Sequence, residues 1–194
     1  MKNIAVCAIL AGAAGLFCVN SQTQTASSPL PQELRPAVPA ATLLGQATMK
    51  FWGFEVYQAT LWVAPGFVEG NYERSPFALD LAYLRDFKGA DIAQRSIAEM
   101  RRQSPMTPAQ EIAWKTQMRA LFPDVKRGDR ITGVNQPATG AVFWNNGRLL
   151  GEVRDPGFAK QFFGIWLSPQ TSEPQLRRAL LEQAKGTASA GAAP

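Results

Sequence analysis

The chain has 194 residues and a formal net charge of +5, with 20 Lys or Arg side chains against 15 Asp or Glu. This length suits one globular domain. The sequence contains no histidine, which excludes Ser-His and Cys-His catalysis and any zinc site built on histidine. The basic side chains form no long run, so they indicate a solvated surface and not a nucleic-acid-binding protein.

The first 21 residues have the pattern of a signal peptide. Lys2 supplies a positive start, and the apolar stretch 4–19 is shorter than the roughly 20 residues that span a membrane. Val19 and Ser21 suit the positions before a signal peptidase cut. We therefore expect cleavage after Ser21 and a periplasmic or secreted product.

A lipoprotein signal is the alternative, because Cys18 ends the apolar stretch. Such signals usually have Leu three residues before the cysteine and a small residue directly before it, where this chain has Gly15 and Phe17. Ordinary cleavage is therefore favoured. It removes Cys7 and Cys18, the two cysteines of the sequence, so we expect no disulfide and no thiolate ligand in the mature protein.

Residues 22–41 are rich in Pro, Ser, Thr, Gln and Ala without a hydrophobic period, which predicts a flexible tether. Residues 185–194 predict a disordered tail on the same grounds. The segment between them, 42–184, has the usual size of one domain and is long enough to hold a core without disulfides.

Three segments near the start of this domain have the composition of strands, at 47–52, 54–64 and 77–87. The third alternates most clearly, because one of its faces carries the row Phe77, Leu79, Leu81 and Tyr83, with Arg85 at its end. We expect this apolar row to face a core.

Two helices are predicted next, at 90–103 and 107–122. The second opens with Thr107, Pro108 and Gln110, which form a capping box with proline in the first turn. The apolar side chains of this segment recur at helical spacing.

Three short strands are predicted at 129–136, 141–146 and 148–153, and the Asn145–Gly147 stretch indicates a hairpin turn between the last two. A helix at 156–167 ends at the Ser-Pro pair that follows it.

Ser172 is expected to be the N-cap of a final helix. The order of strands, two helices, strands and two helices predicts an α+β domain with an antiparallel sheet covered by helices on one face.

The sequence resembles the chalcone isomerase-like family of exported bacterial proteins over residues 43–181. The resemblance is carried, in this order, by "FEVYQATLWV", "FALDLAYLRDFKGADIAQRSIAEM", "LFPDVKRGDRITG" and "FAKQFFGIWLS". The family is similar in fold to plant chalcone isomerase and to plastid fatty-acid-binding proteins. The resemblance implies an open-faced β-sandwich with a cleft between the sheet and the helices.

The resemblance does not bring the polar residues of chalcone isomerase with it. The positions of the enzyme's threonine, tyrosine and asparagine fall at Trp52, Ile92 and Glu99, and no arginine lies between Pro36 and Trp52. We therefore expect no catalytic residues of this kind, and no cofactor or metal.

Tyr83 and Arg85 are the most suggestive polar pair, because together they offer a hydroxyl and a charged fork to a ligand carboxylate. In the alternative, Tyr83 closes the core and Arg85 pairs with Asp86, Asp91 or solvent.

Large aromatic side chains either line an apolar ligand cavity or fill the core; the candidates are Trp52, Tyr57, Trp62, Trp144 and Trp166. The predicted ligand-binding residues combine the polar pair with two of these aromatic residues; they are Tyr83, Arg85, Trp52 and Tyr57.

The leading hypothesis is an exported, non-catalytic protein that binds a small hydrophobic ligand such as a fatty acid. One alternative is an isomerase or lyase acting on an unsaturated ketone. Another is an envelope assembly or interaction protein. Peripheral contact with an anionic membrane is also considered, through basic side chains that equally fit an ordinary solvated surface; these are Arg95, Arg101, Arg102, Lys126, Arg127 and Arg130.

Overall fold

The computed structural model describes Pro31 and residues 34–182. The predicted signal peptide (1–21), the first part of the predicted tether and the predicted tail (185–194) lie outside the described residues. Among the described residues, no helix is both long enough and apolar enough to cross a membrane. The same residues contain no group of three or more His, Cys, Asp or Glu that could hold a metal ion.

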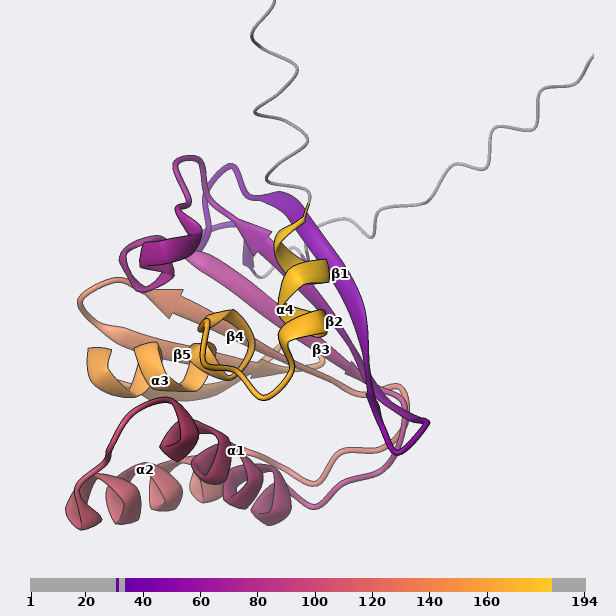
Figure 1. Cartoon of the computed structure of the whole chain (residues 1–194), viewed down its shortest axis with the longest axis vertical. Coiled ribbons are helices and arrows are strands. Elements are labelled where there is room, and N and C mark those ends of the chain that lie inside the picture. Colours follow the sequence, from indigo (N-terminus) through magenta and orange to yellow (C-terminus); the bar gives the residue numbers. More distant parts are fainter. Residues whose placement is uncertain (1–30, 32–33, 183–194) are drawn as a thin grey trace, which may run out of the picture.

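The core of the fold is one antiparallel sheet in which each strand pairs with the next along the chain (Figure 1). Its strands are β1 (Thr42–Phe51), β2 (Phe54–Val63), β3 (Phe77–Tyr83), β4 (Arg130–Gln136), β5 (Gly140–Asn145) and β6 (Arg148–Val153). The antiparallel sheet and the α+β class are as predicted.

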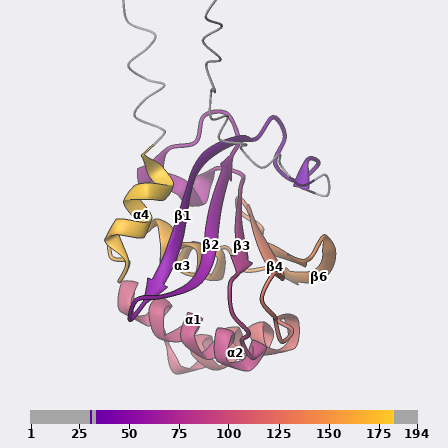
Figure 2. The same cartoon turned by 90° about the vertical axis from the view of Figure 1, so that its right-hand side faces the viewer.

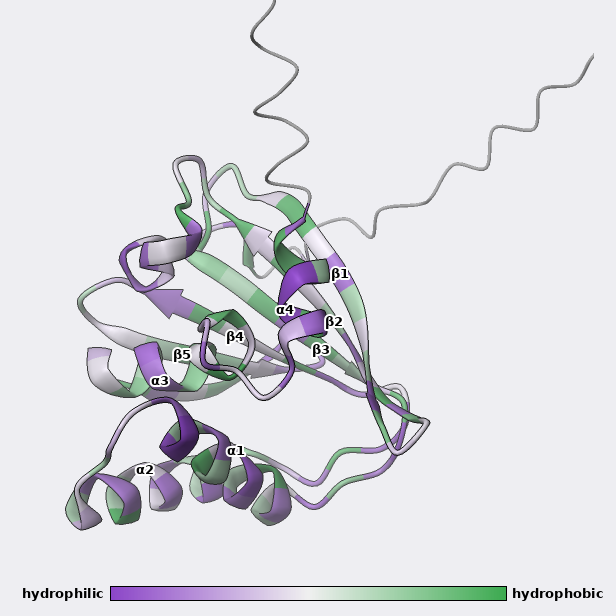
Figure 3. Cartoon of the chain, in the orientation of Figure 1, coloured by the Kyte–Doolittle hydropathy of each residue, from purple (hydrophilic) through white to green (hydrophobic). Residues whose placement is uncertain are grey.

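Four α-helices gather on one side of the sheet in Figures 1 and 2. They are α1 (Gly89–Gln103), α2 (Pro108–Leu121), α3 (Pro156–Leu167) and α4 (Pro174–Leu181), and a 3₁₀ helix, η2 (Glu69–Arg74), precedes β3. α4 lies along β1, α3 packs on β5, and α1 packs on both α2 and α3. Figure 3 shows hydrophilic and hydrophobic residues alternating along α1 and α2, as amphipathic helices require.

Side chains of β3 point alternately to the two faces of the sheet, and one of these faces packs against the helices. Phe77, Leu79, Leu81 and Tyr83 are buried in the main core under the helices, as predicted. The strand ends at Tyr83. The expectation that Arg85 ends the same row is therefore wrong: the chain turns away after β3, and Arg85 is exposed.

Helix starts were predicted with mixed success. The capping box of α2 is confirmed, because the Gln110 backbone N–H donates to Thr107 Oγ1 (3.2 Å) and the Thr107 N–H donates to Gln110 Oε1 (3.0 Å). The N-cap predicted for α4 is wrong. That helix begins at Pro174 after Glu173, and the Ser172 hydroxyl instead donates to Glu99 of α1 (2.7 Å).

The last residues of the predicted tether are part of the folded domain. Leu34 and Val38 are fully buried against the outer face of the sheet, in a small second core with Trp62, Ala78 and Val134. The prediction of a tether through residue 41 is therefore wrong from Leu34 onward, because two apolar side chains in a polar-looking segment were enough to dock it on the sheet.

The close approach of α4 to β1 depends on a glycine. Gly45 follows an irregularity in β1, and a Cβ there would lie far inside contact distance of the Leu180 carbonyl oxygen. Gly45→Ala should therefore lower the free energy of unfolding by about 1–3 kcal/mol. Gly70→Ala is the matched control, because a Cβ at Gly70 meets no atom within 4 Å; equal urea midpoints for the two variants would contradict this account.

Candidate functional site

A cavity of about 330 Å³ lies between the inner face of the sheet and the helices. Strands β1 to β4 supply one wall, with Met49, Phe51, Val56, Tyr57, Leu81, Tyr83 and Ile131. The opposite wall comes mainly from α1, α3 and α4, with Ile92, Phe162, Ile165, Trp166 and Leu176. The two walls are largely apolar, so the space is suited to a hydrophobic molecule.

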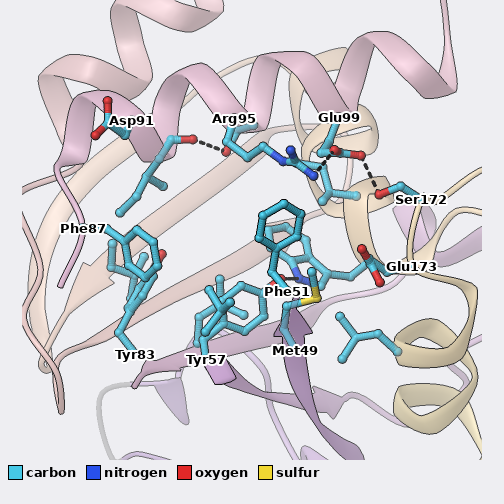
Figure 4. A pocket seen from close by; sticks show the side chains of 18 of the residues that line it. Met49, Phe51, Tyr57, Tyr83, Phe87, Asp91, Arg95, Glu99, Ser172 and Glu173 are labelled. Carbon is cyan, nitrogen blue, oxygen red and sulfur yellow. Dashed lines mark hydrogen bonds and ion pairs between the residues drawn. The ribbon is translucent and has the colours of Figure 1, made fainter. Parts of the chain in front are cut away.

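The surface opening of the cavity is marked by lining residues that are also exposed. These are Phe51 at the end of β1, Asp91 and Arg95 on α1, and Ser172 before α4. The Arg95 guanidinium lies 5.9 Å from the centre of the Phe51 ring. Figure 4 shows α1 with Arg95 above Phe51, and Met49 and Tyr57 rising from the strands below.

One polar cluster lines this apolar space, and its centre is Glu99. This carboxylate is buried, with Oε1 2.7 Å from Arg95 Nη2 and 3.7 Å from Arg102 Nε. Oε1 has no well-aligned hydrogen bond within the described structure, so charge rather than a directed bond holds the pair. Oε2 accepts the hydrogen bond from Ser172. A buried carboxylate requires such partners, because desolvation alone would penalise its charge.

Two tyrosines face each other across neighbouring strands. Tyr57 and Tyr83 are partners in the β2–β3 register, and their rings meet edge to face at 6.1 Å between centres. The Tyr57 hydroxyl accepts a hydrogen bond from Trp166 Nε1 (3.0 Å). The Tyr83 hydroxyl has no hydrogen-bond partner within the described part of the chain. Its O–H remains able to donate to a ligand.

Burial raises the pKa of both phenols well above the ordinary tyrosine value, in Tyr57 against the opposing effect of the Trp166 hydrogen bond. Both side chains are therefore neutral at physiological pH. Tyr57 is partly buried as a whole residue, and its hydroxyl end is enclosed between the sheet and α3. In this site the tyrosines act as hydrogen-bonding groups and not as bases.

The structure separates the four predicted ligand-binding residues into two pairs. Tyr57 and Tyr83 line the cavity. Arg85 does not, because its guanidinium lies 4.8 Å over the ring of Phe54 on the outside of the domain. Trp52 is exposed in the turn between β1 and β2 and does not line the cavity either.

The other aromatic candidates also divide. Trp166 lines the cavity, whereas Trp62 and Trp144 belong to the small core on the outer face of the sheet. Sequence reasoning missed the roles of Arg95, Glu99 and Ser172. A usable signal existed for two of them, because Arg95 and Glu99 are four residues apart on one helix and so share a face.

An antiparallel sheet with helices on one face and an apolar cavity between the two layers defines an open-faced β-sandwich. A model of the family described as chalcone isomerase-like matches residues 22–182. The chain belongs to the chalcone isomerase-like family. The match extends into the segment predicted as a tether, in agreement with the docked Leu34 and Val38.

Two individual comparisons agree with this assignment. The chain is 29% identical over 142 residues to an uncharacterized protein of Haemophilus influenzae, which covers 73% of this chain and 68% of that protein. It is similar in structure to the fatty-acid-binding protein AtFAP1 of Arabidopsis thaliana, with a TM-score of 0.62, 13% sequence identity, and coverage of 79% of this chain and 94% of that one. The second likeness shows the shared fold.

The raised pKa of Tyr83 has a consequence for stability at alkaline pH. The folded state holds the phenol neutral above the ordinary pKa near 10, so unfolding releases a proton there and stability falls as pH rises. The free energy of unfolding of Tyr83→Phe should fall less steeply with pH than that of the wild type, by up to about 1.4 kcal/mol per pH unit. Urea unfolding between about pH 9 and 11 measures this; parallel pH profiles for the two proteins would refute it.

Proposed function

We propose that this protein is an exported, non-catalytic binder of a small hydrophobic ligand, with a fatty acid as the first candidate. The observation that carries the proposal is the cavity of about 330 Å³ with largely apolar walls. Its volume lies at the lower end of the roughly 300–1,000 Å³ range of small-molecule sites. A compact or partly inserted ligand therefore fits better than a large one.

The polar groups near the opening support an amphipathic ligand with its head at the surface. Arg95 is the one basic residue among those that line the cavity, beside the carboxylates of Asp91, Glu99 and Glu173. Its guanidinium has more donors than the pair with Glu99 uses, so it can bind a second acceptor. A fatty-acid carboxylate at this position would be held by Arg95, and its chain would run along Met49 and Leu176. The fatty-acid-binding activity named for AtFAP1 makes this class a natural first test.

The alternative of an isomerase or lyase has less support. It depended on Tyr57, Tyr83 or Arg85 acting on a ketone. Arg85 is outside the cavity, and the raised pKa of the tyrosines leaves them without a base function at neutral pH. A binding role uses the same groups without requiring proton transfer.

A cavity-filling variant tests the location of binding. Protein isolated from the periplasmic fraction, which also tests export, should carry a hydrophobic molecule in native mass spectrometry. Added fatty acid at about 100 times its dissociation constant should stabilise the protein by about 2.7 kcal/mol. Ile92→Trp should abolish both effects, because Ile92 lines the cavity.

Ile112→Trp is the control for that experiment, because Ile112 is exposed on α2. It adds the same indole outside the cavity and should bind as the wild type does. If Ile92→Trp keeps its melting temperature and still binds fatty acid, the cavity is not the site.

The chemistry of the head group can be tested with a matched pair of ligands. Arg95→Gln should weaken binding of a fatty acid about tenfold, because a charge-assisted hydrogen bond is lost. It should change binding of the fatty alcohol of equal length much less. Arg101→Gln is a close control: Arg101 is on the same helix with 58% of its side chain exposed, against 57% for Arg95, and pairs with Glu111 away from the cavity. Equal losses for acid and alcohol would argue against a bound carboxylate.

A further inference from the structure

The turn between β1 and β2 exposes three large aromatic side chains. The exposed fractions are 50% for Phe51, 87% for Trp52 and 61% for Phe54. We call this group the aromatic tip. It holds three of the six large apolar side chains that are exposed among the described residues. Figure 1 shows the turn projecting at the lower right of the domain. Such clustering is unlike the scattered single apolar residues of an ordinary surface.

The backbone conformation of this turn is unfavourable for tryptophan, so folding alone does not explain why Trp52 is there. Trp52 and Gly53 have φ of 51° and 81°, the left-handed conformation of a two-residue hairpin turn. Asn, Asp and Gly are the residues that favour the first position, and a bulky residue there is strained. The turn between β5 and β6 has nearly the same angles, 49° and 80°, and uses Asn146 and Gly147.

Within the described part of the chain, Trp52 gains little that offsets this strain. Its ring stacks on Phe51 at 5.9 Å between centres, but both rings remain open to solvent. The side chain thus combines an unfavourable conformation with almost complete exposure. Features of this kind are expected where the chain meets something outside itself.

The surroundings favour a lipid surface over a protein partner. A stable protein interface needs about 800 Å² from each side, which three side chains on a narrow projecting turn cannot supply. Tryptophan and phenylalanine are preferred at the membrane–water interface. Arg85 lies 4.8 Å over the Phe54 ring and forms no ion pair within the described structure, so its guanidinium is available to a lipid phosphate.

We propose that the aromatic tip is a membrane-docking element that inserts Trp52 and Phe54 into the interface of a phospholipid bilayer, with Arg85 on the phosphates. The cavity opens beside it, because Phe51 belongs to the tip and also lines the cavity. The tip thus brings the opening to a surface from which hydrophobic molecules can be taken up. This surface exists whether or not the cavity binds a fatty acid.

Vesicle binding of the processed, exported protein tests the proposal. We expect it to cosediment with vesicles of phosphatidylethanolamine and phosphatidylglycerol, with a blue shift of tryptophan emission. Trp52 should supply most of this shift, because it is 87% exposed, whereas Trp62, Trp114 and Trp166 are buried and Trp144 is partly buried. Brominated lipids should quench the same emission.

Trp52→Asn is the decisive variant, since asparagine suits the turn. It should raise the melting temperature and at the same time weaken vesicle binding about tenfold or more. A purely structural role for Trp52 predicts the opposite change in stability. Ile112→Ser, which removes an exposed apolar side chain elsewhere (67% exposed), should bind vesicles normally. Arg85→Gln should weaken binding to the phosphatidylglycerol vesicles more than to vesicles of phosphatidylcholine alone.

Three outcomes would overturn the proposal. They are absence of vesicle binding by the wild type, equal binding by Trp52→Asn, and lipid-free self-association that Trp52→Asn abolishes, which would assign the tip to a second copy of the chain. Failure here is distinguishable from failure of the proposed ligand binding. Ile92→Trp should lose ligand and keep vesicle binding, whereas Trp52→Asn should keep ligand binding in solution.

Discussion

Packing of phenylalanine rings between α3 and the sheet sets the spacing on which the rest of the structure depends. Phe163 meets Phe77 of β3 at 4.8 Å between ring centres, and Phe162 meets Phe143 of β5 at 5.1 Å. Gly133 of β4 makes this possible, because a Cβ there would press on the rings of Phe163 and Phe143. Rings of this size hold α3 at a fixed height above the central strands. Toward β1 and β2 the two layers are not packed together in this way, and the cavity lies between them.

The polar cluster fixes the helices that bound this space. Glu99 on α1 holds Ser172, and the segment after Ser172 leads directly into α4. Leaving a buried carboxylate without partners would strongly destabilise the fold. The contact of Glu99 with Ser172 therefore holds the start of α4 firmly against α1. Gly45 then lets the other end of α4 lie against β1. The Glu99–Ser172 contact and the close approach at Gly45 thus hold α4 at the cavity. The Trp166–Tyr57 hydrogen bond links α3 to β2.

Sequence patterns predicted the parts of this arrangement that depend on local order. The β3 row from Phe77 to Tyr83, the capping box at Thr107 and the turn at Asn146 follow from alternation, capping and turn chemistry. The errors arose where tertiary contacts override local signals. Arg85 left the row because the strand ended, Ser172 bound Glu99 instead of capping its helix, and Leu34 docked out of a segment with the composition of a linker.

The candidate site was half predictable for the same reason. Tyr57 and Tyr83 share a face with core residues, so alternation directs them inward. Arg95 and Glu99 line the cavity only because the fold brings α1 to the same cavity as the last residues of β1 and β3. At the opening, Phe51 contacts Trp52 on its outer side and lies under Arg95 on its inner side. Arg95 in turn is paired with Glu99. Because Phe51 belongs to the exposed turn and also lines the cavity, the turn and the opening of the cavity share one aromatic ring, which lies beside the only basic side chain among the described cavity-lining residues.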